Sequence, residues 1–163
     1  MPESIEVVAT DKARRYGELL PQLEALVAGE PDLIANLANL SAALMQGISA
    51  ASWVGFYILR GRDLVLGPFQ GKVACVRIRL GRGVCGTAAA EGRTLVVPDV
   101  DRFPGHIACD AASRSEIVVP VRDPEGRLVA VIDVDSAQLN AFDDTDAGAL
   151  ARVAALAGSL GGW

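Results

Sequence analysis

Between residues 52 and 59 the chain reads "SWVGFYIL", a segment whose two alternating faces are both apolar. Alternation of this length predicts a β-strand, and apolar residues on both faces are typical of a buried one. Further strands are predicted from the segments "LVLGPF", "CVRIRL", "TLVVPDV", "EIVVPV" and "LVAVIDVDS". The turns "RGRD" and "RDPEGR" join neighbouring strands as hairpins, so we expect an antiparallel sheet.

Helical patterns lie on both sides of the strand segments in the sequence. A first helix is expected over residues 11–29, with a break or restart at Pro21. A second helix follows a predicted cap at Asp32, and its expected apolar face consists of Leu33, Ile34, Leu37, Leu40, Leu44 and Met45. "GRGVCGTAAAEG" predicts a short helix after a glycine-rich turn, and the capping pattern "FDDTD" predicts a last one. This order indicates an α+β fold in which helices pack against one face of the sheet.

Length and charge restrict the class of protein. The 163 residues suit a single domain spanning residues 1–163, and the net charge of −5 leaves no basic stripe for nucleic acid or anionic membranes. No apolar run reaches the roughly 18 residues of a membrane span. The N-terminal "MPESIEVVATDKARR" has acidic residues where a signal peptide needs positive charge, so a cytoplasmic location is expected.

Three cysteines differ in their surroundings. Cys109 lies in the loop "GHIACDAASRS", which has no apolar pattern, so core packing explains it least well. Cys85 follows Gly83 at a helix start, where the helix dipole would stabilise a thiolate, whereas Cys75 is expected to open a strand and fits the core. His106 and Cys109 have an H-x-x-C spacing, but structural zinc sites usually consist of two tight pairs, so a metal is disfavoured.

Carboxylates and aromatic residues supply the other candidates. Asp133 and Asp135 share one face of the strand "LVAVIDVDS", where partial burial and mutual repulsion would raise a carboxyl pKa, so that the pair can receive an ammonium group or supply an acid. Glu116 begins a strand, and Trp53 and Tyr57 share a strand face that can form the wall of a pocket. The alternatives are a solvent-facing pair at the sheet edge for the two aspartates, a charged strand end for Glu116, and core packing for the two aromatic residues. Together these residues suggest a small cationic or zwitterionic ligand and a nucleophilic sulfur.

Four motifs resemble a known family in order and in spacing: "GPFQGKVACVRI", "GRGVCGTA", "GHIACDAASRSEIVVPV" and "VIDVDS". They are similar to the free methionine-(R)-sulfoxide reductases, a catalytic branch of the GAF domains. The resemblance implies a GAF fold with about six antiparallel strands, and a substrate that is the free amino acid rather than the residue within a protein. It implies no cofactor. It also implies that Cys109 is the nucleophile, that Cys75 resolves it, and that Cys85 is a third cysteine of less settled role.

The same resemblance makes Glu116, Asp133 and Asp135 the carboxylates of the substrate pocket, and Trp53 and Tyr57 the aromatic side that receives the methyl-sulfur end. The reaction would leave Cys109 as a sulfenic acid, which a second cysteine converts into a disulfide. Thioredoxin or a similar dithiol would then reduce this disulfide. Apolar helical faces at both termini favour a homodimer. Two assignments stay open because both depend on geometry: the second cysteine that resolves the sulfenic acid, and the carboxyl group that donates the proton. A GAF-type sensor without catalysis and a zinc-binding domain are the rival interpretations.

Overall fold

The computed structural model describes residues 4–163; residues 1–3, the start of the stretch in which no signal peptide is expected, lie outside the described residues. Four α-helices, one 3-10 helix and six strands follow in the order α1 (Lys12–Val27), α2 (Leu33–Gly47), β1 (Trp53–Arg60), β2 (Asp63–Gln70), β3 (Arg77–Arg79), α3 (Gly83–Glu91), β4 (Leu95–Val97), η1 (Val100–Arg102), β5 (Ser115–Arg122), β6 (Leu128–Ser136) and α4 (Asp144–Gly158). None of the helices in this described part is both long and apolar enough to cross a membrane.

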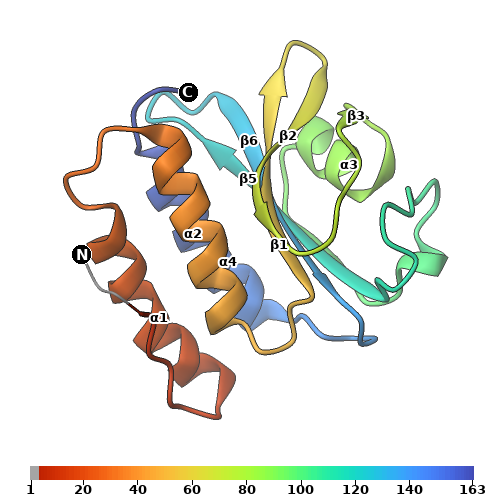
Figure 1. Ribbon diagram of the computed structural model, residues 1–163. Coiled ribbons are helices and arrows are strands. Elements are labelled where there is room, and N and C mark those ends of the chain that lie inside the picture. Colours follow the sequence, from red (N-terminus) through yellow and green to blue (C-terminus); the bar gives the residue numbers. More distant parts are fainter. Residues whose placement is uncertain (1–3) are drawn as a thin grey trace.

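The strands form one sheet in the order β3-β2-β1-β6-β5-β4, and every neighbouring pair is antiparallel. The predicted α+β fold with its antiparallel sheet is therefore confirmed. Figure 1 shows α1, α2 and α4 on one side of the sheet and α3 on the other. The expectation that helices cover only one face is thus wrong. Because β1 is apolar on both faces, both faces need cover.

Alternation along β1 divides the interior into two cores. Val54 and Phe56 point into the larger core, which the sheet forms with α1, α2 and α4. Trp53 and Tyr57 point to the opposite side, into a smaller core that includes Cys85 and other residues of α3. The two faces of β1 thus have different roles. One packs against the three long helices, and the other forms part of the surroundings of Cys85.

Two details of the helices differ from the sequence-based expectation. The first helix runs through Pro21 without a break, since Leu19, Leu20 and Leu23 on both sides of the proline are buried in the same core. Packing of this face outweighs the hydrogen bond that the proline removes. Ile34 is 55% exposed and does not belong to the buried face of α2. The predicted start signals are present, because Asp32 caps α2 and Asp143 forms a capping box at α4.

The C-terminal end of α4 lies against β5 at Gly158. A Cβ atom at this position would collide with the backbone carbonyl oxygen of Arg122, so only glycine permits the observed approach of the helix to the strand. Gly148, ten residues earlier in the same helix, has no neighbour within 4 Å of such a Cβ atom. Gly148 is therefore the matched control for a substitution at Gly158.

We expect opposite effects of the same substitution at these two positions. Gly158→Ala should lower the free energy of unfolding by about 2 to 3 kcal/mol through overpacking. Gly148→Ala should raise it by about 0.5 to 1 kcal/mol, because alanine loses less conformational entropy in a helix. Urea unfolding of the oxidised proteins measures both, and equal effects would contradict the close contact between α4 and β5.

Candidate active site

Three carboxyl groups meet on the sheet face that carries α3. In the register of the sheet, Asp135 pairs with Trp53 on one side and with Glu116 on the other, while Asp133 pairs with Gly55. Asp133 and Asp135 are two residues apart, and Glu116 is directly opposite Asp135, so all three side chains point to one face. Asp133 and Glu116 are only 5% and 6% exposed. Because β6 lies in the middle of the sheet, the alternative of a solvent-facing pair at the sheet edge is wrong.

Burial controls the protonation of this cluster. Loss of water raises the pKa of Glu116 and of Asp135 well above their ordinary values, and the nearby charge of Asp133 adds to both shifts. Burial raises the pKa of Asp133 to about 6, against hydrogen bonds from Glu116 and Cys85 that lower it. Within residues 4–163, Asp133 Oδ1 has no hydrogen-bond partner. The cluster therefore retains a proton near neutral pH and offers a buried acceptor to a ligand.

Cys85 lies in the first turn of α3 and faces this cluster. Its side chain is buried, and its thiol donates a hydrogen bond to Glu116 Oε1 over 3.7 Å. Burial and the charges of Asp133 and Glu116 raise the pKa of the Cys85 thiol well above its ordinary value. The expectation that the helix start stabilises a thiolate here is wrong, because desolvation and neighbouring carboxylates outweigh the helix dipole. Cys85 is a neutral thiol.

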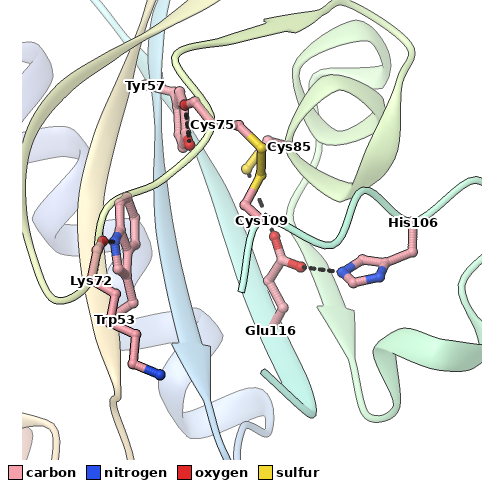
Figure 2. The surroundings of a disulfide bond; sticks show 8 residues. All are labelled: Trp53, Tyr57, Lys72, Cys75, Cys85, His106, Cys109 and Glu116. Atoms are coloured by element: carbon pink, nitrogen blue, oxygen red, sulfur yellow. Dashed lines mark hydrogen bonds and ion pairs between the residues drawn. A yellow bond between two sulfur atoms is a disulfide. The ribbon is translucent and has the colours of Figure 1, made fainter. Parts of the chain in front are cut away.

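A disulfide between Cys75 and Cys109 lies beside this thiol (Figure 2), and the two Cα atoms are 5.5 Å apart. It links the segment between β2 and β3 to the loop before β5. The strand predicted from "CVRIRL" is present as β3, but its expected start at Cys75 is wrong, since β3 begins only at Arg77 and Cys75 is in irregular backbone. Cys85 remains the free cysteine of the described residues. In this redox state Cys109 cannot serve as the thiolate ligand of an H-x-x-C metal site.

Two of the three aromatic residues of β1, Trp53 and Tyr57, hold the segment that carries Cys75. Trp53 Nε1 donates a hydrogen bond to the carbonyl of Lys72 over 3.0 Å, and the Tyr57 hydroxyl donates one to the carbonyl of Cys75 over 2.9 Å (Figure 2). The two rings stack with centroids 6.0 Å apart, and Phe69 stacks on the other side of Trp53 at 5.3 Å. The aromatic wall therefore also positions the disulfide-bonded Cys75, a role that the sequence did not indicate.

The predicted residues converge on one pocket. Its lining includes seven of the eight site residues predicted from the sequence: Trp53, Tyr57, Cys85, Cys109, Glu116, Asp133 and Asp135. Cys75, the eighth, is joined to the pocket through its disulfide to Cys109. Residues from β1, β5, β6, α3 and the loop before β5 thus surround one small space, in which the disulfide, the Cys85 thiol and the carboxyl groups meet.

The structure adds pocket residues that the sequence did not single out for such a role. His106 Nε2 lies 3.9 Å from Glu116 Oε2 (Figure 2), and burial lowers the pKa of His106 against the opposing charge of Asp101, which favours a neutral imidazole. Ser113 is buried in the lining, and its side chain opposes the rise in the pKa of Asp135. Ser113 lies in the same motif as Cys109 and Glu116, but a serine in a polar loop carries no signal of its own.

A metal-ligand set also exists in this cluster. The sulfur of Cys85 and carboxylate oxygens of Glu116 and Asp133 all lie within 4.8 Å of one another. These are ligand types that zinc accepts, but metal ligands must be deprotonated, and burial opposes ionisation of these groups. The expectation that the protein functions without a metal stays a prediction.

The fold and the pocket on its α3 side define a GAF domain, and residues 27–160 match the GAF domain family. The chain is 52% identical to GAF domain-containing protein A of Dictyostelium discoideum, over 90% of this chain and 92% of that protein. It is 48% identical to the free methionine-R-sulfoxide reductase of Escherichia coli, over 89% and 87% of the two chains. The crystal structure of free methionine-R-sulfoxide reductase from Neisseria meningitidis in complex with its substrate superimposes with a TM-score of 0.92, at 50% identity over 96% of this chain and 94% of that one. The chain belongs to the free methionine-R-sulfoxide reductase family of GAF domains.

The buried state of Cys85 predicts low reactivity. In the native oxidised protein, a thiol reagent such as 5,5′-dithiobis(2-nitrobenzoic acid) should find no rapidly reacting group, because the remaining thiol is buried and neutral. Unfolding in guanidinium should expose one equivalent. Rapid reaction of a thiol in the folded oxidised protein would contradict the burial of Cys85.

The raised carboxyl pKa values predict a pH-dependent stability. The folded cluster binds protons more tightly than the unfolded chain, so this contribution is complete below about pH 4 and is lost progressively as the pH rises from there through the raised pKa values, the one for Asp133 being about 6. Glu116→Gln removes one ionisable group from the cluster. We expect it to be about 1 to 3 kcal/mol more stable than the wild type at pH 8, with a smaller difference at pH 4.5.

Denaturant unfolding of the oxidised proteins at both pH values measures this difference. The exposed Glu24 provides the control, and Glu24→Gln should change stability by less than about 0.5 kcal/mol at either pH. A Glu116→Gln protein that is less stable than the wild type at pH 8 would show that Glu116 is ionised and favourably paired in the fold.

Proposed function

We propose that this protein reduces free L-methionine (R)-sulfoxide to L-methionine by thiol chemistry. The observation that carries the proposal is a pocket in which disulfide-forming Cys109 and a buried, partly protonated carboxyl cluster line the same space. A sulfoxide needs a sulfur nucleophile and a proton for its oxygen, and a free amino acid brings an ammonium group for the carboxylates. The reductase from Escherichia coli and the substrate-bound reductase from Neisseria meningitidis support the same assignment.

Substrate recognition follows from the charges of the lining. The carboxyl cluster, with the unpartnered Asp133 Oδ1, would receive the substrate ammonium through charge-assisted hydrogen bonds. A peptide nitrogen carries no such charge, so a methionine sulfoxide residue within a protein would be rejected. In the described residues no side chain caps the start of α3, so its first amides can receive the substrate carboxylate beside Arg82, which also lines the pocket. The methyl-sulfur end would lie against Trp53 and Tyr57.

In the chemical step, the thiolate of reduced Cys109 attacks the sulfoxide sulfur. A protonated carboxyl donates to the sulfoxide oxygen as the sulfur-oxygen bond breaks, and Glu116 is our choice because burial raises its pKa strongly. The resulting hydroxyl group passes from the substrate sulfur to Cys109 Sγ, the bond between the two sulfur atoms breaks, and methionine leaves while Cys109 becomes a sulfenic acid. The Cys75 thiol then attacks this sulfur, water departs, and the Cys75–Cys109 disulfide forms.

Turnover requires an external electron donor. We propose a dithiol protein of the thioredoxin class, which returns two electrons to the disulfide, and a reducing compartment such as the cytoplasm. The homodimer expected from the apolar helical faces stays a prediction.

A single set of reactions tests the proposed activity. Protein, free methionine sulfoxide of either epimer and dithiothreitol are incubated, and released methionine is measured. We expect release from the R epimer only. Cys109→Ser should lose at least about a thousandfold in rate, because it removes the nucleophile. Cys75→Ser should release one equivalent of methionine rapidly and then slow down.

Two outcomes would contradict this account. Undiminished turnover by Cys109→Ser would remove the assignment of the nucleophile. Absence of methionine from either epimer would favour the sensor interpretation.

A further inference from the structure

Exposed aliphatic side chains gather around the disulfide. Val73 and Val76 flank Cys75 and are 89% and 65% exposed, while Ile107, two residues before Cys109, is 36% exposed. We call these three side chains the disulfide rim. A scattered exposed valine needs no explanation, but an apolar group around a redox-active disulfide is typical of a surface that contacts a partner.

The rim is not needed to hold its own segment in place. The backbone between Lys72 and Val76 is attached by its carbonyl groups, which accept hydrogen bonds from the Trp53 ring, the Tyr57 hydroxyl and, at Val76, the Leu66 amide over 2.9 Å. Main-chain anchoring leaves the two valine side chains free to face solvent. Val73 also lines the pocket, but Val76 does not, so packing within the fold does not explain the exposure of Val76.

Charge near the rim favours an anionic reactant. The whole chain has a net charge of −5, yet residues 71–82 contain Lys72, Arg77, Arg79 and Arg82 and no acidic residue. The side chains of Lys72 and Arg77 are 72% and 63% exposed, although Asp110 and Asp63 on neighbouring segments lie near them at 3.6 and 3.9 Å. Since the nucleophile in disulfide reduction is a thiolate, positive side chains around the disulfide increase its local concentration.

We propose that the disulfide rim is the docking surface for a dithiol reductant protein of the thioredoxin class, which attacks the Sγ atom of Cys75. This inference rests on the proposed function, since it concerns the regeneration of the same site. Val73, Ile107 and Cys109 line the pocket, whereas Cys75 and the 65% exposed Val76 do not, so Val76 marks the outer side of the disulfide at Cys75. The rim thus presents the Cys75 end of the disulfide to a partner.

The exchange is balanced in two steps. The reductant thiolate forms a bond to Cys75 Sγ, the Cys75–Cys109 bond breaks, and Cys109 leaves as the thiolate that the next turnover needs. The second thiol of the reductant, after loss of its proton, then attacks the sulfur of its own first cysteine in the mixed disulfide. Cys75 departs and takes up that proton, and the reductant leaves as a disulfide, oxidised by two electrons.

Substitution of Val76 separates docking from chemistry. Val76→Asp and Val76→Lys should each raise the KM for a purified bacterial thioredoxin, recycled by its reductase and NADPH, at least about fivefold. Turnover with dithiothreitol should stay unchanged, because a small dithiol needs no docking surface. Ile34→Asp is the matched control: this side chain is 55% exposed on α2, on the opposite side of the sheet, and its loss should change neither reaction.

An unchanged KM for thioredoxin in both Val76 variants would overturn the proposal. An increase with Asp alone would also overturn it, because charge rather than apolar contact would then recognise the partner. Trapping with the wild-type enzyme is independent of any folding defect. A thioredoxin whose second cysteine is serine should form a mixed disulfide that peptide mapping locates at Cys75, and a bond to Cys109 would contradict the proposed direction of attack. Failure of the proposed function itself would appear separately, as no methionine release with dithiothreitol.

Discussion

The clustering of three carboxyl groups, two of them buried and one half-buried, on one face of a β-sheet is the constraint on which the rest of this site depends. The antiparallel register of β1, β6 and β5 brings Glu116, Asp133 and Asp135 together where little water reaches them. Charges so close and so poorly hydrated cannot all be present without a counterion. The fold therefore keeps protons on the cluster in the free protein, and in the mechanism we propose one of them is donated to the departing sulfoxide oxygen.

The same sheet face also positions the cysteines close to the carboxyl groups. Trp53 and Tyr57 project from β1 beside the cluster and bind the backbone that carries Cys75, so the strand that forms the pocket wall also fixes one half of the disulfide. Cys85 lies beneath, buried as a neutral thiol against Glu116. The half-buried cysteines of the disulfide and the fully buried Cys85 are thus expected to differ in reactivity, because they differ in access to water and in distance from the carboxylates.

Features that arise from local alternation were predictable from the sequence. The strands, the caps at Asp32 and Asp143, and the common face of Asp133 and Asp135 all follow from periodicity and from the chemistry of short polar side chains. Features that arise from tertiary packing were not. The prediction of a thiolate at Cys85 was wrong because it considered only the helix start, which is visible in the sequence. The carboxylates that oppose ionisation of the thiol come from strands distant in the sequence.

The remaining differences have a similar origin. The run from Cys75 has the composition of a strand, but hydrogen bonds from β1 hold its first residues in irregular backbone. Pro21 continues a helix because leucines on both sides of it are buried together. The pairing of Cys75 with Cys109, 34 residues apart, was implied only by the family resemblance, because the distance between Cα atoms does not follow from sequence separation.

Infrared spectroscopy of the buried carboxyls tests the central claim most directly. At pH 7 the free protein should show the carbonyl stretch of a protonated carboxylic acid, and Glu116→Gln should remove or shift this band, because burial holds a proton in the cluster that contains Glu116. A spectrum that contains only ionised carboxylates at pH 7 would contradict the claim that the fold stores the proton used in the reduction.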